Sequence, residues 1–209
     1  MSLFPAFIKL ARRRCLLVGA GEVALQKIPS LLAAEAEVRV VAPRICAEIA
    51  ALAAEGRLTV EERAFSVSDL DGVFLVIAAT DDPAVNAAVY DGAVERNVLC
   101  NSVDDPPHCD FYFGSVVARG DLQIAISTAG ESPALAQRLR KEIDAQLPDD
   151  LGGWLTETGR LRREVLARVE AGEERKMLLH RLAEREVCGA AACQARGVAF
   201  GAAVRGRVY

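Results

Sequence analysis

The first hundred residues alternate between short apolar runs and longer amphipathic segments. The apolar runs predict strands at 14–18, 38–41, 58–62, 73–79 and 98–103. The segments between them predict helices at about 23–35, 46–55 and 84–96. The run at 73–79 is apolar on both faces, which is typical of a central parallel strand covered on both sides. This alternation predicts an α/β fold with a Rossmann-type doubly wound parallel sheet.

The pattern changes near residue 104. The runs at 111–118 and 122–127 flank Arg119-Gly120-Asp121 and predict an antiparallel hairpin. Ser132 as a cap and Pro133 at the first helical position predict a helix to about 147. A break at 149–153 and one charged helix from 154 to about 186 follow. We predict four parts: a first domain at 1–110, a small α+β region at 111–147, a helical region at 148–187 and a flexible tail at 188–209.

Composition narrows the function classes. The 209 residues are 52 % hydrophobic and 26 % charged, which indicates a globular protein with a substantial core. We read neither a membrane-spanning run nor a signal peptide, and therefore expect a cytoplasmic protein that does not associate with a membrane. The net charge of −4 does not favour nucleic acid. The six cysteines form no disulfide framework, and two histidines offer little for a metal site, so no resident metal is expected.

A glycine motif follows the first predicted strand. Gly19 permits a tight turn, Gly21 lets the backbone approach a pyrophosphate, and Ala24 allows close packing of helix on sheet. Glu22 and Val23 open the helix, whose free N–H groups favour phosphates. Because the motif lies inside a β-α-β unit, it predicts dinucleotide binding rather than an ordinary strand–helix turn.

The end of the second strand leaves the choice of dinucleotide open. An acidic residue about 20 positions after the motif usually binds the ribose 2′-hydroxyl of NAD. Here the strand ends in Ala42-Pro43-Arg44, and we predict that Ala42 and Pro43 contact the cofactor. Arg44 is suited to the 2′-phosphate of NADP or to packing on the adenine, so the residues alone do not separate NAD from NADP.

Two further loops fall at carboxyl ends of predicted strands, where a cofactor crevice forms. In the first, Thr80 is placed beside the nicotinamide, whereas Asp81 and Asp82 are equally well explained as helix caps. In the second, which begins at Asn101, the carboxylate of Asp104 is suited to act as a general base.

Residues 127–133 form a small-residue loop at a helix N-terminus, which is suited to an anion. Basic residues nearby are interpreted either as a polyanion-binding cluster or as a solvated face. They are Arg119, Arg138, Arg140 and Lys141.

The ordered set of motifs resembles the bifunctional sirohaem synthase module, precorrin-2 dehydrogenase/sirohydrochlorin ferrochelatase. The resemblance covers about residues 3–147, with a weaker helical match to about 186. The segments that carry it are FPAFIKLARRRCLLVGAGEVALQK, VVAP, VIAATDD, CNSVDD and AISTAGESPALAQRLRKEI. Ser102, Asp105 and the tail beyond 186 depart from the family pattern.

The resemblance implies an enzyme that oxidises precorrin-2 to sirohydrochlorin with NAD⁺ as cofactor. Many family members then insert Fe²⁺, while others lack this step or use Co²⁺ in a cobalamin pathway. By position in the family motifs, Asp104 becomes the catalytic residue, and Asn101 and Thr128 become substrate-binding candidates. Because the implied substrate has eight carboxylates, the basic residues Arg119 and Arg138 are further substrate-binding candidates. The family also implies a homodimer, formed through residues 111–147.

A non-catalytic, NAD-sensing regulatory Rossmann module is the alternative. Such modules share the glycine turn and a strand end like VIAATDD. They do not explain the motifs at 101–105 and 127–133, which favour the enzyme.

Overall fold

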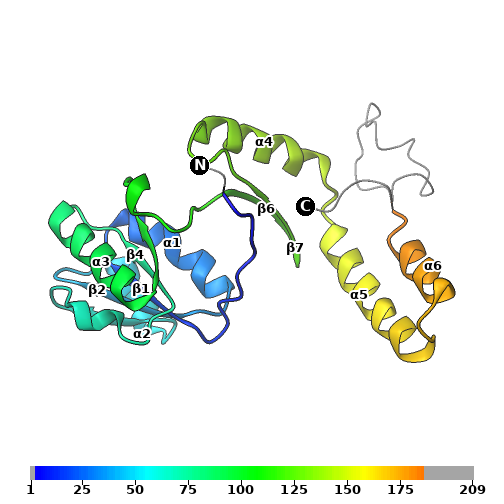
Figure 1. Ribbon diagram of the computed structural model, residues 1–209, viewed down its shortest axis with the longest axis horizontal. Helices are drawn as coiled ribbons and strands as arrows, with labels where there is room; N and C mark the ends of the chain where they lie inside the picture. The colour runs from blue at the N-terminus through cyan, green and yellow to red at the C-terminus, as the bar shows by residue number, and fades with distance from the viewer. Residues whose placement is uncertain (1–2, 186–209) are drawn as a thin grey trace. The chain divides into compact units, whose positions relative to one another are not determined.

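The computed structural model describes residues 3–185, and these divide into two compact units, residues 3–113 and residues 114–185. We describe each unit by itself. The first unit holds all of the predicted strands that form the large sheet (Figure 1). The tail predicted at 188–209 lies outside the described residues.

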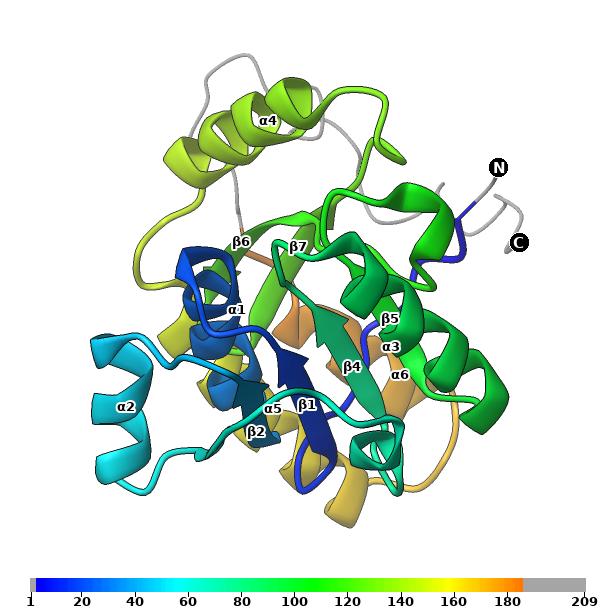
Figure 2. The same ribbon diagram turned by 90° about the vertical axis from the view of Figure 1, so that its left-hand side faces the viewer.

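The first unit is built on a five-stranded parallel sheet with strand order β3-β2-β1-β4-β5. The strands are β1 (Arg14–Val18), β2 (Glu37–Ala42), β3 (Thr59–Glu62), β4 (Leu75–Ala78) and β5 (Leu99–Ser102). The helices are α1 (Glu22–Ala33), α2 (Ala47–Ala54) and α3 (Pro83–Arg96), with short 3₁₀ turns η1 (Val67–Leu70) and η2 (Pro106–His108). Helices α1 and α2 cover one face and α3 covers the other (Figure 2), which confirms the predicted doubly wound fold.

The core lies on both faces of this sheet because neighbouring side chains of a strand point to opposite sides. Cys15 and Leu17 of β1 pack in the cluster that includes α1. Leu16 and Val18 pack in the cluster that includes α3. All four β4 residues are buried, which explains why that run shows no polar alternation.

The second unit begins with an antiparallel hairpin of β6 (Ser115–Arg119) and β7 (Leu122–Ile126). Three helices follow: α4 (Pro133–Gln146), α5 (Leu151–Arg168) and α6 (Glu173–Leu182). Helix α4 packs on both strands, and α5 packs on β7 and on α6. None of the helices in residues 3–185 combines the length and apolar character that a bilayer crossing requires.

The helical region differs from the predicted break at 149–153 and single helix from 154. Helix α5 begins at Leu151 and includes both glycines of the predicted break. A Cβ on Gly152 would stand 2.8 Å from the backbone of Arg119, so the glycine allows α5 to approach the hairpin turn. The single long helix is wrong because the chain leaves the helical conformation at Val169, and α6 starts after Gly172.

Candidate dinucleotide-binding site

A cavity of about 670 Å³ lies at the carboxyl ends of the parallel strands. It spans the point between β1 and β4 where the strand order reverses, the usual ligand position in open α/β sheets. It is lined by Gly19, Ala20, Gly21, Glu22, Val23, Ala42, Pro43, Arg44, Ile45, Cys46, Ala79, Thr80, Asp81, Val103 and Asp104. The structure therefore brings together all seven residues that the sequence assigned to the cofactor and the proposed catalytic aspartate.

Glycine is required at positions 19 and 21 for two different structural reasons. Gly19 has a φ of +105°, and a Cβ there would stand 2.3 Å from the carbonyl oxygen of Ala79, so the turn itself requires glycine. At Gly21 a Cβ would find no atom within 4 Å. Protein packing therefore does not explain Gly21, whereas a pyrophosphate approaching the backbone does.

Helix α1 presents its N-terminus to the same cavity. Its cap residue Gly21 has no side chain that could bond the first N–H groups. Ala24 is fully buried against the sheet, as the motif predicts for close helix–sheet packing. The residues here thus fit the phosphates of a dinucleotide, because uncapped N–H groups and the helix dipole favour anions.

The loops of the crevice are fixed by backbone hydrogen bonds that continue the sheet. Gly19 N–H donates to Val41 O at 2.9 Å, and Ala79 N–H donates to Val18 O at 2.8 Å. Val103 N–H donates to Ala78 O at 2.9 Å. The main chain at the start of each crevice loop is thus hydrogen-bonded to a neighbouring strand or its end.

Thr80 lines the crevice, and its polar groups are already engaged. Its hydroxyl donates to Asn86 Oδ1 at 2.7 Å, and Asn86 Nδ2 donates to Thr80 O at 3.1 Å. Asp82 accepts from the backbone of Ala84 at 2.8 Å and so caps α3, the capping role considered from sequence. The sequence reasoning missed Asn86, since nothing in its spacing marks it as the residue that fixes this loop.

Asp104 also lines this cavity, two residues after β5. It has a φ of +60°, a left-handed conformation that aspartate tolerates better than most residues. Its side chain is exposed and has no hydrogen bond or ion pair within residues 3–185. The carboxylate is thus free to accept a proton. Asp105 is instead occupied, at 2.6 Å from His108 Nδ1, in the turn that follows.

Asn101 lies below this loop and is buried. Its Nδ2 donates to Phe111 O at 2.8 Å and contacts Cys109 Sγ at 3.4 Å. Burial raises the pKa of Cys109, which keeps the thiol protonated to donate to Ser102 O at 3.1 Å. The structure gives Asn101 a part in holding the Asp104 loop, and its substrate contact stays a prediction.

The other substrate candidates belong to the second unit. Arg119 is mostly buried and donates to Asp144 Oδ1 at 2.7 Å. Thr128 Oγ1 accepts from Ser132 N–H at 3.2 Å. Arg138 is well exposed and lies 3.3 Å from Glu142, one turn along α4.

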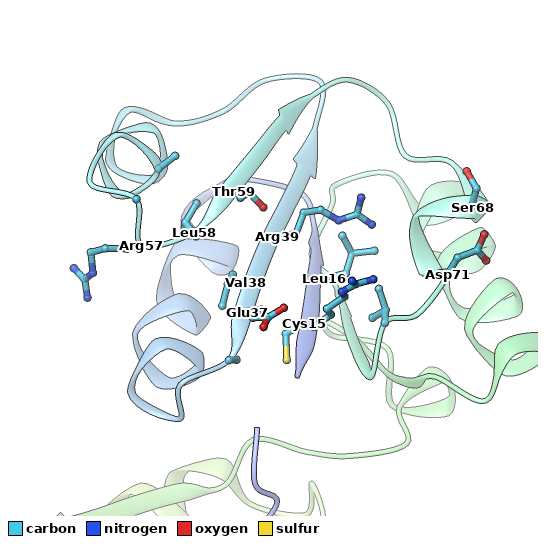
Figure 3. Close-up of a pocket in the computed structure, with 15 residues that line it drawn as sticks. Cys15, Leu16, Glu37, Val38, Arg39, Arg57, Leu58, Thr59, Ser68 and Asp71 are labelled. Carbon is cyan, nitrogen blue, oxygen red and sulfur yellow. The ribbon is translucent and has the colours of Figure 1, made fainter. Parts of the chain in front are cut away.

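Figure 3 shows a second cavity, of about 770 Å³, at the amino ends of the parallel strands. Residues at the starts of strands line it, among them Arg14, Glu37 and Thr59. Arg39, also in its wall, lies 3.0 Å from Glu61 and is occupied. The glycine turn and Asp104 lie at the carboxyl ends of the strands, so this larger cavity is not the dinucleotide site.

Within residues 3–185 no group of three or more His, Cys, Asp and Glu side chains converges as a metal site.

The fold, the glycine turn and the uncapped helix N-terminus define a dinucleotide-binding α/β protein. The family model described as putative NAD(P)-binding matches residues 6–115. The chain belongs to this family. A second model, described as sirohaem biosynthesis protein central, matches residues 119–146.

Similarity to curated proteins and to a solved structure extends over most of the chain. Siroheme synthase 1 of Serratia proteamaculans is 44 % identical over 176 residues, which are 84 % of this chain and 37 % of that protein. Siroheme synthase 1 of Yersinia enterocolitica is 46 % identical over the same shares. The chain thus spans little more than a third of these relatives.

The solved structure of SirC, precorrin-2 dehydrogenase, superposes with a TM-score of 0.74 at 27 % identity, covering 86 % of this chain and 89 % of that one. These matches confirm the resemblance to the sirohaem synthase module.

Proposed function

We propose that the chain catalyses the NAD⁺-dependent oxidation of precorrin-2 to sirohydrochlorin in sirohaem or cobalamin biosynthesis. The observation that carries this proposal is the similarity to SirC, precorrin-2 dehydrogenase, over nearly the full length of both chains. The crevice supports it, because the turn at Gly19 and the open backbone at Gly21 fit a dinucleotide. A nucleotide-sensing module does not account for the match of residues 119–146 to the sirohaem biosynthesis model.

The oxidation removes a hydride and a proton from the tetrapyrrole. A dinucleotide held by the Gly19–Val23 turn would supply the hydride acceptor. Asp104 accepts the proton, since its carboxylate lines the crevice, faces water and has no competing partner among residues 3–185. The left-handed backbone at Asp104 and the hydrogen bond from Asn101 to Phe111 O, which joins the two ends of this loop, support that role.

Substrate binding is proposed for basic and hydroxyl groups of the second unit. Precorrin-2 has eight carboxylates, so an acidic chain needs a local basic surface to bind it. Arg138 and Lys141 are exposed and three residues apart on α4, hence on one side of the helix. Thr128 stands in the loop before α4. Arg119 has weaker support, because Asp144 already neutralises it.

We further propose a cytoplasmic homodimer formed through residues 111–147. The hairpin in this segment is a two-stranded sheet, so both of its strands have an unpaired edge. Val116 on β6 is 46 % exposed. A second copy of the chain is the partner that would cover this surface, and light scattering of the purified protein measures the assembly.

The direct test is anaerobic incubation with precorrin-2 and NAD⁺ while the visible spectrum is followed. A sirohydrochlorin spectrum that forms only with NAD⁺ supports the proposal. No spectral change, with dinucleotide binding confirmed separately, favours the regulatory alternative. Addition of Fe²⁺ or Co²⁺ then tests metal insertion, which the names of the siroheme synthase relatives suggest. A metal-dependent change faster than the enzyme-free control supports that second step.

Asp104→Asn tests the catalytic assignment. Asparagine is similar in size and tolerates the left-handed backbone, yet it cannot accept the proton. We expect turnover to fall about 100-fold or more, the usual contribution of a general base, with NAD⁺ affinity unchanged. Asp91→Asn is the matched control, since Asp91 is an exposed acid on α3 away from the crevice. Wild-type turnover in the Asp104 variant would remove the assignment.

A further inference from the structure

We propose that the crevice accepts the 2′-phosphate of NADP⁺ through Arg44, so that the chain binds NADP⁺ as well as NAD⁺. This inference rests on the proposed function, because it concerns the adenosine end of the same dinucleotide site. Two observations support it. Arg44 has no partner among residues 3–185, and β2 does not end in the acidic residue that an NAD-selective site has there.

Arg44 follows β2 by two residues and lines the crevice. It is the basic residue among the fifteen that line this cavity, and the acidic residues there are Glu22, Asp81 and Asp104. Its side chain is exposed and has no hydrogen bond or ion pair within the described part of the chain. A guanidinium without a partner retains all its donors for a phosphate.

Arg39, the arginine within β2, differs from Arg44 in its partners. Arg39 lies 3.0 Å from Glu61 and 3.6 Å from Asp69, so its charge is already balanced. It also belongs to the cavity at the opposite edge of the sheet (Figure 3). Arg44 therefore has no structural role that competes with binding a ligand.

The carboxylate that selects NAD is absent from this end of the crevice. In dinucleotide-binding folds an acid at the end of the second strand binds the ribose 2′-hydroxyl and repels a 2′-phosphate. Here β2 ends in Ala42, followed by Pro43. Glu62 pairs in register with Ala42 on the neighbouring strand, but it does not line the crevice. Near the end of β2, the residues that line the cavity thus include a charge that attracts a 2′-phosphate, Arg44, and none that repels it.

Packing of Arg44 on the adenine is the competing explanation, and it makes a different prediction. Adenine is common to both dinucleotides, so stacking would strengthen NAD⁺ and NADP⁺ equally. A phosphate contact strengthens NADP⁺ alone and weakens as salt is added.

The experiment measures dissociation constants of NAD⁺ and NADP⁺ by calorimetry for the wild type, Arg44→Ala and Arg57→Ala. Arg57 is an exposed arginine at the other edge of the sheet and serves as the matched control. In the wild type we expect the two constants to agree within about tenfold. Arg44→Ala should weaken NADP⁺ about tenfold or more, the effect of losing one charged hydrogen bond, and leave NAD⁺ nearly unchanged. Arg57→Ala should change neither constant.

Two results overturn the inference while leaving the proposed function intact. One is wild-type protein that binds NAD⁺ but binds NADP⁺ about 100-fold more weakly, the ratio expected of a repelled phosphate. The other is an Arg44→Ala variant that weakens both dinucleotides equally. If the wild type binds neither dinucleotide, the proposed function itself fails.

Discussion

Replacing Gly21 by alanine adds one methyl group to the wall of the crevice. The backbone at Gly21 is extended, with φ −89° and ψ −168°, and a Cβ there meets no atom within 4 Å. The folded protein thus bears no strain from the substitution, and the unfolded chain loses flexibility. We expect the free energy of unfolding to stay constant or to rise by about 0.4–1 kcal/mol.

Dinucleotide binding should respond in the opposite way. The methyl group occupies space through which a pyrophosphate approaches the N–H groups at the start of α1. Loss of one hydrogen bond to a charged phosphate costs about 1.5–3 kcal/mol, which corresponds to a roughly 10- to 150-fold larger dissociation constant. Gly21→Ala should consequently fold as well as the wild type and bind NAD⁺ at least about tenfold more weakly.

Gly19→Ala is the matched contrast. Its φ of +105° disfavours alanine, and the new Cβ would stand 2.3 Å from Ala79 O and 2.7 Å from Ala79 C. Backbone strain of about 1–3 kcal/mol adds to overpacking of about 1–3 kcal/mol. The free energy of unfolding should therefore fall by about 2–6 kcal/mol, a large part of the total for a protein domain.

The assay combines urea unfolding with calorimetric titration of NAD⁺ for the wild type and both variants. We expect Gly21→Ala to weaken NAD⁺ binding without loss of stability, and Gly19→Ala to lower the free energy of unfolding. Wild-type affinity in Gly21→Ala would show that this backbone does not face the pyrophosphate. A Gly21→Ala protein as unstable as Gly19→Ala would show that the space at this position is not open.

Two further predictions concern stability. Asp69 is buried, and Arg63 donates to its carboxylate at 2.6 and 2.9 Å, which holds the pKa of Asp69 below its usual range. Asp69→Asn should lower the free energy of unfolding by about 1–3 kcal/mol at pH 7. A carboxyl whose pKa is lower in the folded protein stabilises the fold at pH values above its unfolded-state pKa of about 3.9. The difference in unfolding free energy between wild type and Asp69→Asn should therefore shrink as pH falls below about 4. A difference that does not change with pH in urea titrations would contradict the ion pair. Arg119→Ala removes the hydrogen bonds from Arg119 to Asp144 and should also lower the free energy of unfolding by about 1–3 kcal/mol. Unchanged stability together with weaker substrate binding would instead make Arg119 a substrate ligand.

The strands and helices of the first unit were predictable because their signals are local. Strand β4 lies within the predicted run at 73–79, and α3 starts one residue before its predicted position. Two glycines in a β-α-β context located the turn before α1. The helical region after residue 148 was less predictable, because its glycines were interpreted as a break. The close approach of Gly152 to the hairpin turn explains why a glycine occupies the second position of α5.

The site shows the same division between local and tertiary information. The sequence by itself determined the order of elements, the glycine turn and the residues that end each strand, because apolar periodicity and turn chemistry are written within a few neighbouring positions. It also singled out Asp104 and Arg44. Only the tertiary structure decided which side chains are free, since partners such as Asp144 for Arg119 and Phe111 for Asn101 lie 25 and 10 residues away. Hydrogen bonds across such separations depend on how the elements pack. Among residues 3–185 this packing leaves Asp104 and Arg44 without partners at the crevice, while it occupies Thr80 and Asn101.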